Sequence, residues 1–326
     1  MSSKKEIILK VENLIQTFTT GEDFLFWKNK QKVNAVNNVS FEVEKNKTLG
    51  LVGESGCGKS TTLRSIMQLY TPTSGNIYFN GKNITKLSKK ELLKTKKDMQ
   101  MVFQDPHTSL DPRMTIKEII AEPLKIYSEN KILPKTTLEI EQRVNELTDI
   151  VGLHKSMLAR YPHEFSGGQR QRIGIARALA LNPKLLLLDE AVSALDVSIR
   201  AQILNLLKTL QREFNLSYLF ISHDLAVVKY MSDKIAVMYL GVILELAPRE
   251  TLFSNPIHPY TKMLIASIPE INPEKRKNKN IKLDEQTLAN IRKIHLSTQV
   301  CPKFEEVEKD HFVSKYLFDE MNKQII

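Results

Sequence analysis

Long apolar segments are missing from this chain, although 42% of its 326 residues are hydrophobic. No run approaches the roughly 18 to 20 apolar residues that a helix needs to cross a bilayer. The lysine-bearing start of the sequence also lacks the apolar stretch of a signal peptide. We therefore expect a soluble protein.

Cysteine is scarce as well, since only Cys57 and Cys301 occur. This usage agrees with a reducing cytoplasm, and no disulfide is expected. The 47 basic residues outnumber the 37 acidic ones, but they are scattered apart from one cluster at Lys275–Lys279, and no aromatic residues are interleaved with that cluster. The charge pattern favours an ordinary lysine-rich surface over a nucleic-acid-binding one.

A glycine-rich segment, Gly53–Ser60, fits the pattern G-x-x-x-x-G-K-[ST]. The apolar run Thr48–Val52 before it suits a buried strand, and Thr61–Leu69 after it is typical of a helix. Glycines let backbone N–H groups converge on phosphate oxygens, and the following helix points its positive end at the same anion. We expect Lys59 to reach the β- and γ-phosphates and Ser60 to ligate Mg²⁺. The candidate nucleotide-binding residues are Gly53, Glu54, Ser55, Gly56, Cys57, Gly58, Lys59, Ser60 and Thr61.

Two adjacent carboxylates, Asp189 and Glu190, end the apolar run Leu185–Leu188. A buried parallel strand that ends in acids delivers them to the phosphate-binding edge of such a sheet. Asp189 suits the Mg²⁺ shell, and Glu190 can polarise the water that attacks the γ-phosphate. Solvated acids at the end of a strand are the alternative interpretation.

Two further strand-like runs end in polar side chains. Tyr218–Ser222 is followed by His223, and an apolar run ending at Phe103 is followed by Gln104. Alone, His223 would be interpreted as a structural histidine and Gln104 as a surface amide. Beside the phosphate loop and the carboxylates, both become candidates for contact with the γ-phosphate.

In their order along the chain, these motifs resemble those of the ATP-binding subunits of ABC transporters. The resemblance covers about Ile7 to about Phe253. The resemblance makes Gly53–Ser60 the Walker A loop, Leu185–Glu190 the Walker B strand with its catalytic glutamate, and Phe165–Gln169 the signature motif. It also implies Gln104 as the Q-loop glutamine, Ser193–Asp196 as the D-loop, His223 as the switch histidine, and Mg²⁺ ligation by Ser60, Gln104 and Asp189.

Phe18 stands where this family stacks an aromatic ring on adenine. Phe24, Phe26 or Trp27 could stack there instead, and Phe18 could be a core residue. The sequence alone leaves these alternatives open.

The same resemblance implies a partner, because two such subunits meet head to tail and the signature of one covers the ATP of the other. Ser166 would supply a hydroxyl, Gly167 and Gly168 backbone N–H groups, and the helix expected over Gln169–Leu181 its N-terminus. A flexible turn before a helix is the alternative. The residues expected to act in trans are Ser166, Gly167, Gly168, Gln169 and Asp196.

Finer features resemble the oligopeptide and dipeptide branch of importer ATPases, among them Met101–Pro106, Ser109–Met114 and His258–Leu264. This resemblance implies a non-identical ATPase partner, two permease subunits, an external substrate-binding protein and a place at the cytoplasmic face of the cell membrane. The transported solute stays open, since nickel and other small-solute importers have nearly the same ATPase. A non-transport ABC ATPase acting on nucleic acid or ribosomes is the competing class.

The chain departs from the family pattern in three ways, at two single positions and in the tail. Ala191 replaces a common proline after the catalytic glutamate, and Asn46 replaces a frequent glycine, although asparagine tolerates positive φ. Many relatives end in a four-cysteine tail that binds an iron–sulfur cluster. Here Cys301 keeps one thiol, but Glu308 and Lys315 stand at two other thiol positions, so no cluster is expected.

The predicted fold is therefore α/β: a P-loop NTPase core of ABC type, with an antiparallel β portion from Ile7–Phe41 and Ser74–Gly81. Strands at Ile235–Tyr239 and Val242–Leu246, separated by Gly241, are expected to close the core. The predicted organisation is an ATPase domain over 1–255 with a helical subdomain over about 105–181, then a linker over 256–282 within a C-terminal extension over 256–326.

Overall fold

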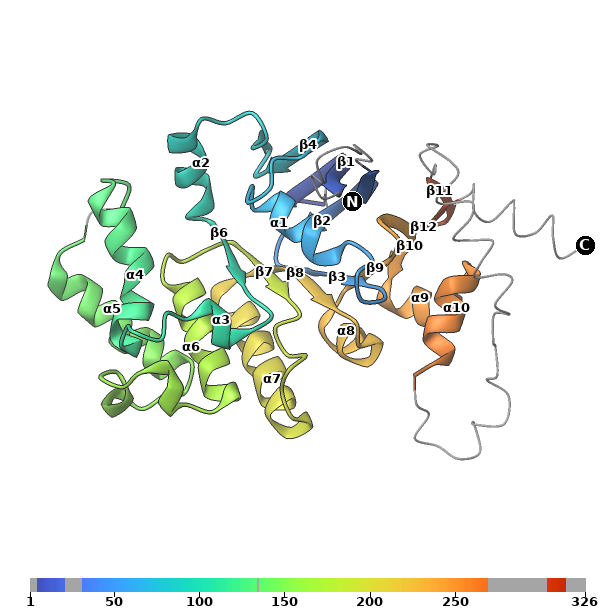
Figure 1. Ribbon diagram of the computed structural model, residues 1–326. Coiled ribbons are helices and arrows are strands. Elements are labelled where there is room, and N and C mark those ends of the chain that lie inside the picture. The colour runs from blue at the N-terminus through green and yellow to red at the C-terminus, as the bar shows by residue number, and fades with distance from the viewer. Residues whose placement is uncertain (1–4, 21–30, 134, 269–303, 315–326) are drawn as a thin grey trace, which may run out of the picture. The chain divides into compact units, whose positions relative to one another are not determined.

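The computed structural model describes residues 5–20, 31–133, 135–268 and 304–314 (Figure 1). The chain forms two compact units. Unit 1 comprises Met1–Ile8, Glu44–Lys47 and Lys86–Phe220; unit 2 comprises Leu9–Val43, Thr48–Thr85 and Ile221–Ile326. Among the described residues, no helix is both long and apolar enough to span a membrane.

The strand that ends in Asp189 lies in a parallel part of the sheet in unit 1. Strand β7 (Leu185–Asp189) pairs with β6 (Met99–Val102) in parallel and lies between β6 and β8 (Ser217–Ser222), whose last two residues belong to unit 2. All five residues of β7 are buried, which explains its unbroken leucine run. Strands covered on both faces show continuous apolar sequence rather than alternation.

Helices make up the rest of unit 1. Helices α4 (Ile116–Glu129), α5 (Thr137–Ile150) and α6 (Gly167–Leu179) pack against one another, and α7 (Val197–Phe214) packs on α6 (Figure 1). Each of α4, α5 and α6 begins with a capping box, which explains their sharp N-terminal ends. The short elements of this region are α2 (Lys89–Lys96), α3 (Pro106–Ser109), η1 (Lys155–Met157) and η2 (Pro162–Glu164).

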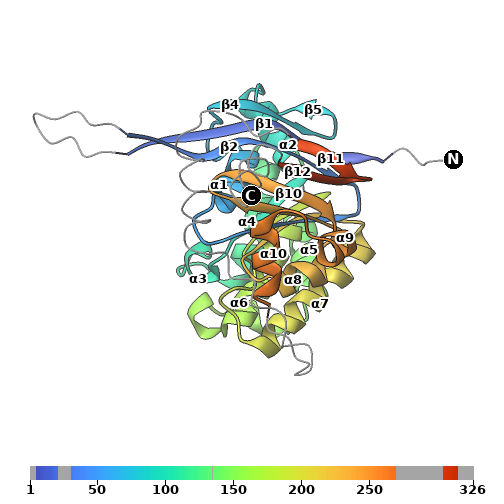
Figure 2. The same cartoon turned by 90° about the vertical axis from the view of Figure 1, so that its right-hand side faces the viewer.

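An antiparallel four-stranded sheet, in the order β2-β1-β4-β5, occupies the first part of unit 2 (Figure 2). Leu9 of β1 pairs with Phe79 of β4, and both are buried. The predicted antiparallel β portion is confirmed. Its strands are β1 (Ile7–Thr20), β2 (Gln31–Glu44), β4 (Ser74–Phe79) and β5 (Lys82–Asn83), with the first residues of β1 and the last of β2 belonging to unit 1.

Other strands of unit 2 belong to the eight-stranded sheet that also contains β6, β7 and β8, and one of them leads into the phosphate loop. Strand β3 (Thr48–Val52) pairs in parallel with β9 (Lys234–Tyr239), and β9 pairs antiparallel with β10 (Val242–Pro248). Gly241 has φ +87° in the turn between them, as its predicted place between two strands requires. The sheet continues to β12 (His311–Ser314) and β11 (Phe304–Glu308) (Figure 2).

The linker predicted over 256–282 is wrong in its first part, because α10 (Pro259–Ala266) lies there, after α8 (Leu225–Met231) and α9 (Arg249–Ser254). His258 caps α10 by accepting a hydrogen bond from the backbone N–H of Tyr260, and Pro259 occupies the first helical position. Proline is favoured there because its missing N–H would have no partner in the helix. Residues 269–303 lie outside the described part.

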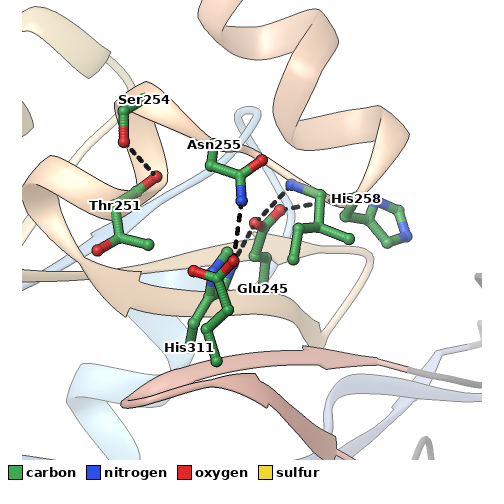
Figure 3. Close-up of polar contacts among 8 residues, drawn as sticks. Glu245, Thr251, Ser254, Asn255, His258 and His311 are labelled. Atoms are coloured by element: carbon green, nitrogen blue, oxygen red, sulfur yellow. Dashed lines mark hydrogen bonds and ion pairs between the residues drawn. The ribbon is translucent and has the colours of Figure 1, made fainter.

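Glu245 on β10 contacts both the start of α10 and strand β12, which comes much later in the sequence (Figure 3). Its carboxylate accepts hydrogen bonds from the backbone N–H groups of Ile257 and His258, both at 2.9 Å, and contacts His311 Nε2 at 2.8 Å. Glu245 and His311 are completely buried. Because buried charge needs partners, this carboxylate ties both the start of α10 and strand β12 to the sheet.

Candidate functional site

The phosphate loop connects β3 to α1 (Lys59–Ile66) in unit 2. Gly58 is the N-cap of α1 and has φ +106°. The helix begins at Lys59, two residues before the predicted start at Thr61. The Lys59 ammonium is buried and donates hydrogen bonds to the carbonyl oxygens of Gly53 at 2.8 Å and Glu54 at 2.7 Å. The lysine thus closes the loop on itself, and its backbone is held in a tight curve.

Neighbouring backbone holds the loop from several directions. A Cβ on Gly53 would lie 2.1 Å from the carbonyl oxygen of Met238, and one on Gly58 would lie 2.2 Å from that of Ala35. The Gly241 N–H donates to the carbonyl oxygen of Cys57 at 2.8 Å. Packing against neighbouring backbone therefore requires glycine at two positions of the motif.

The outer part of the loop is open. Glu54, Ser55 and Gly56 are exposed, and a Cβ on Gly56 would meet no atom within 4 Å. Cys57 is buried, and its burial raises the pKa of the thiol despite the nearby Lys59 charge, so the thiol contributes packing rather than reactivity. An exposed cradle of backbone above a buried lysine fits an anionic ligand.

Phe18 and His223 are also placed in unit 2. Phe18 is half-buried, and its ring contacts Tyr70 edge to face with centroids 5.3 Å apart, so it is not a core residue. The competing aromatics, Phe24, Phe26 and Trp27, lie outside the described residues. His223 is exposed directly after β8, where the sequence pattern predicted it.

Asp189 and Glu190 lie at the end of β7 in unit 1, and both are buried. The Gln104 amide donates a hydrogen bond to the Glu190 carboxylate, Nε2 to Oε2, at 3.1 Å. The structure therefore brings together two of the three predicted catalytic side chains. Their contact shows that the end of β6 and the end of β7 meet at one edge of the sheet, as parallel pairing requires.

The backbone of Glu190 is held in an unusual conformation. Its φ is +45°, which is rare for a residue other than glycine. The Ser193 N–H and hydroxyl both donate to the Glu190 carbonyl oxygen, at 3.0 and 2.9 Å, and Ala191 is buried after it. These contacts hold the strained residue in place, a pattern that clusters at functional sites.

The signature run Phe165–Gln169 forms the N-terminus of α6. Ser166 is the exposed N-cap, and it exchanges hydrogen bonds with Gln169 in a capping box. The helix starts at Gly167, two residues before the predicted start at Gln169, because Ser166 and Gln169 form that box. A Cβ on Gly168 would lie 2.4 Å from Ile199 Cγ2 of α7. Gly168 therefore has a packing role that the sequence did not reveal.

Asp196, expected to act in trans, is exposed at the N-cap of α7 and makes no side-chain capping bond. The next residue, Val197, is 80% exposed. An apolar side chain so exposed beside a candidate interface residue is consistent with a covered surface in an assembly.

Other features belong to neither predicted group. A cavity of about 580 Å³ in unit 1 is lined by Arg143, Lys184 and Phe214 among others, but by none of the predicted site residues. In the described part of the chain, no group of three histidine, cysteine or acidic residues could hold a metal ion. Cys301 and Lys315 lie outside that part, so the expectation about the iron–sulfur cluster stays a prediction.

Comparison with known proteins decides the family. Residues 36–193 match the family described as ABC transporter, and residues 244–301 match the oligopeptide/dipeptide transporter C-terminal region. The oligopeptide transport ATP-binding protein OppF of Bacillus subtilis is 50% identical over 94% of this chain and 96% of its own length. The chain belongs to the ABC transporter family, in its oligopeptide/dipeptide branch. The predicted resemblance is confirmed.

Two further relatives agree with this membership of the ABC family. The oligopeptide transport ATP-binding protein AppF of Bacillus subtilis is 47% identical over 97% of this chain and 99% of its own. A dimeric ATP-binding cassette in a post-hydrolysis state, bound to ADP and phosphate, has a TM-score of 0.65 and 29% identity. The match covers 74% of this chain and 98% of the cassette. The predicted ABC-type P-loop fold is therefore confirmed.

Proposed function

We propose that this protein is the ATP-binding and ATP-hydrolysing subunit that powers peptide import through an ABC permease. The carrying observation is the phosphate loop, with a buried Lys59 under an open backbone cradle, in a chain 50% identical to an oligopeptide transport ATP-binding protein. The open cradle favours a phosphate ligand, and the relative's name favours peptides as the cargo.

The loop residues bind the nucleotide. Lys59 exchanges its loop carbonyl partners for the β- and γ-phosphate oxygens, while the backbone N–H groups of Gly53–Thr61 surround the phosphates. Phe18 stacks on the adenine, and its half-buried ring in contact with Tyr70 supports that role because the ring is anchored yet accessible.

Mg²⁺ neutralises charge on the phosphates when it is bound with the nucleotide. The donors fit this ion, because the Ser60 hydroxyl, the Gln104 amide oxygen and the Asp189 carboxylate are all hard oxygen ligands. Asp189 is almost completely buried, which suits a carboxylate that is neutralised by a cation.

Hydrolysis needs a base and a residue that senses the γ-phosphate. Glu190 accepts a proton from the attacking water, which leaves ADP and inorganic phosphate as products. Gln104 holds the Glu190 carboxylate at 3.1 Å and so orients it, and the exposed His223 contacts the γ-phosphate. The strained Glu190 backbone keeps the carboxylate where the strand ends.

The signature residues act on a partner's nucleotide. Ser166, Gly167, Gly168 and Gln169 offer the exposed N-terminus of α6 to an anion, and Asp196 lies on a similarly exposed helix start. The related cassette of known structure is a dimer bound to ADP and phosphate, which supports this arrangement. We propose a non-identical ATPase as the partner.

Two permease subunits and an external substrate-binding protein complete the proposed importer, with this subunit at the cytoplasmic face of the cell membrane. The names of the relatives, oligopeptide transport ATP-binding proteins, support this assembly. We propose no role in nucleic-acid binding.

The test combines isolation of the complex with a change at Glu190. The tagged chain should co-purify with two membrane subunits and a second ATPase, whereas ribosomes or DNA in the eluate would favour a non-transport ATPase. In the purified complex, Glu190→Gln should retain ATP binding and lower hydrolysis about 100-fold or more, since it removes the general base.

Glu250→Gln is the matched control, because Glu250 is an exposed acid on α9 that pairs with Arg249. It should hydrolyse ATP at the wild-type rate. If Glu190→Gln hydrolysed ATP equally fast, Glu190 would not be the base.

A further inference from the structure

Tyr260 is a completely buried side chain on the first turn of α10, which belongs to the C-terminal part of the chain. Its ring packs against Tyr239, the last residue of β9, with centroids 4.5 Å apart and planes tilted by 48°. Tyr239 follows Met238, whose carbonyl oxygen contacts Gly53. Tyr260 thus packs at the strand end that carries one side of the phosphate loop.

The phosphate loop also faces the Tyr260 hydroxyl. Burial raises the pKa of this hydroxyl most, the charges of Glu54 and Cys57 raise it further, and the backbone N–H of Glu54 acts in the opposite sense. The hydroxyl nevertheless makes no hydrogen bond of regular geometry. The hydroxyl therefore lies near the loop without a regular hydrogen bond, and the packing of the ring against Tyr239 keeps it there.

The start of α10 is fixed in position, so its side chains cannot easily move away from the loop. The backbone N–H groups of Ile257 and His258 both donate to the buried Glu245 carboxylate (Figure 3). His258 Nδ1 then accepts from the Tyr260 N–H at 3.1 Å. Tyr260 is attached through these bonds to β10.

We propose that Tyr260 is a positioning residue for ATP binding, whose ring supports the inner side of the Glu54–Cys57 segment. The inference rests on the proposed function, in which that segment binds phosphate. Binding is strongest when the donor groups are already arranged before the ligand arrives, because no ordering cost is then incurred on binding. The C-terminal region thereby contributes to nucleotide affinity without touching the nucleotide.

The experiment measures Mg·ATP affinity and binding stoichiometry on the full-length chain by calorimetry. Tyr260→Leu removes the ring but keeps an apolar side chain. It should raise the Kd for ATP about tenfold, which corresponds to about 1.4 kcal/mol, with stoichiometry unchanged. Tyr260→Phe restores the ring and should bind ATP within about twofold of wild type. A purely structural role would instead lower the stoichiometry and leave the Kd of the folded fraction unchanged.

Tyr218→Phe is the matched control, because Tyr218 is equally buried and its hydroxyl donates to the Leu207 carbonyl oxygen at 2.8 Å in unit 1. It should lower the melting temperature and leave ATP affinity unchanged. If Tyr260→Leu does not fold, Tyr239→Leu removes the ring that holds Tyr260 and should raise the Kd in the same direction.

An unchanged Kd in the folded leucine variants would overturn the inference. If wild type bound no Mg·ATP, the proposed function itself would fail. If wild type bound ATP and the folded leucine variants bound it equally well, only the role of Tyr260 would fail.

Discussion

The phosphate loop and the signature run are both short glycine-containing segments at helix N-termini, yet they are held in different ways. Neighbouring backbone and the Lys59 side chain fix the loop, and strand β9, strand β2 and the β9–β10 turn all contact it. The signature run is held by its own capping box, by the burial of Phe165 and by the close approach of Gly168 to Ile199, while Ser166 stays exposed.

The difference follows from the proposed tasks. A loop that binds this chain's own ATP can be fixed by its surroundings, because its ligand arrives at the open side only. A segment that serves a partner's ATP has to be exposed, so its rigidity must come from the helix that it starts. Glycine substitutions in the two segments test this comparison, and a further experiment concerns His258 at the start of α10.

The largest expected effect comes from Gly53→Ala. The new Cβ would lie 2.1 Å from the Met238 carbonyl oxygen, which is backbone and cannot rotate away. We expect a loss of about 3 kcal/mol or more in the free energy of unfolding, at the upper end of overpacking costs, together with loss of ATP binding. Chemical denaturation and calorimetry measure the two effects.

Gly56→Ala is the control within the same loop. Its Cβ meets nothing within 4 Å, but φ is +79°, so only backbone strain of about 1 kcal/mol is expected. Equal losses of stability in the two variants would show that packing does not hold the loop.

A smaller effect, about 1 to 3 kcal/mol, is expected for Gly168→Ala in the signature run. The Cβ would lie 2.4 Å from Ile199 Cγ2, whereas a Cβ on Gly167 would lie 3.6 Å from its nearest neighbour, Leu195. Gly167→Ala should therefore leave the stability almost unchanged. Adding Ile199→Ala to Gly168→Ala should relieve the clash. If the double variant did not recover stability in denaturation, a clash with Ile199 would not explain the effect of Gly168→Ala.

The last prediction concerns acid and the buried His258 at the start of α10, outside both segments. Burial, with a contribution from the Lys262 charge, lowers the pKa of His258 to about 3 from 6.5. Between these values the unfolded chain binds a proton that the folded chain does not, so the stability falls as the pH falls below 6.5. The slope is at most about 1.4 kcal/mol per pH unit.

Denaturation of wild type and His258→Gln between pH 6.5 and 4.5 measures this slope. The variant should lose less stability over that interval, because one of the groups that titrates differently on unfolding is gone. Identical slopes in the two proteins would show that His258 is not responsible. Ser166→Ala, an exposed change at the signature cap, should keep the wild-type slope.

Local sequence patterns predicted the parallel strands, the phosphate loop and the signature helix. The leucine run of β7 and the glycine pattern of Gly53–Ser60 each have a direct physical meaning. Asn46, which replaces a frequent glycine, has the positive φ, +59°, that asparagine tolerates. The contact between Gln104 and Glu190 is a consequence of the parallel pairing of β6 with β7, which the structure shows.

Contacts between distant segments could not be predicted in this way. In the sequence, Tyr260 is only one residue of a run that resembles the family, and a linker prediction there misses the helix signal of His258 before Pro259. The packing of Gly168 on Ile199 depends on the way α6 and α7 meet, which no local pattern encodes.

The Glu245 carboxylate has a consequence for the order in which the protein assembles. Its two backbone partners follow it within 13 residues, but His311 comes 66 residues later. During synthesis, the Glu245 carboxylate cannot make all of its contacts until strand β12 has been synthesised. The phosphate loop is synthesised much earlier. A chain that ends before β12 would keep its nucleotide-binding motifs. It would leave the buried Glu245 carboxylate without its contact to His311.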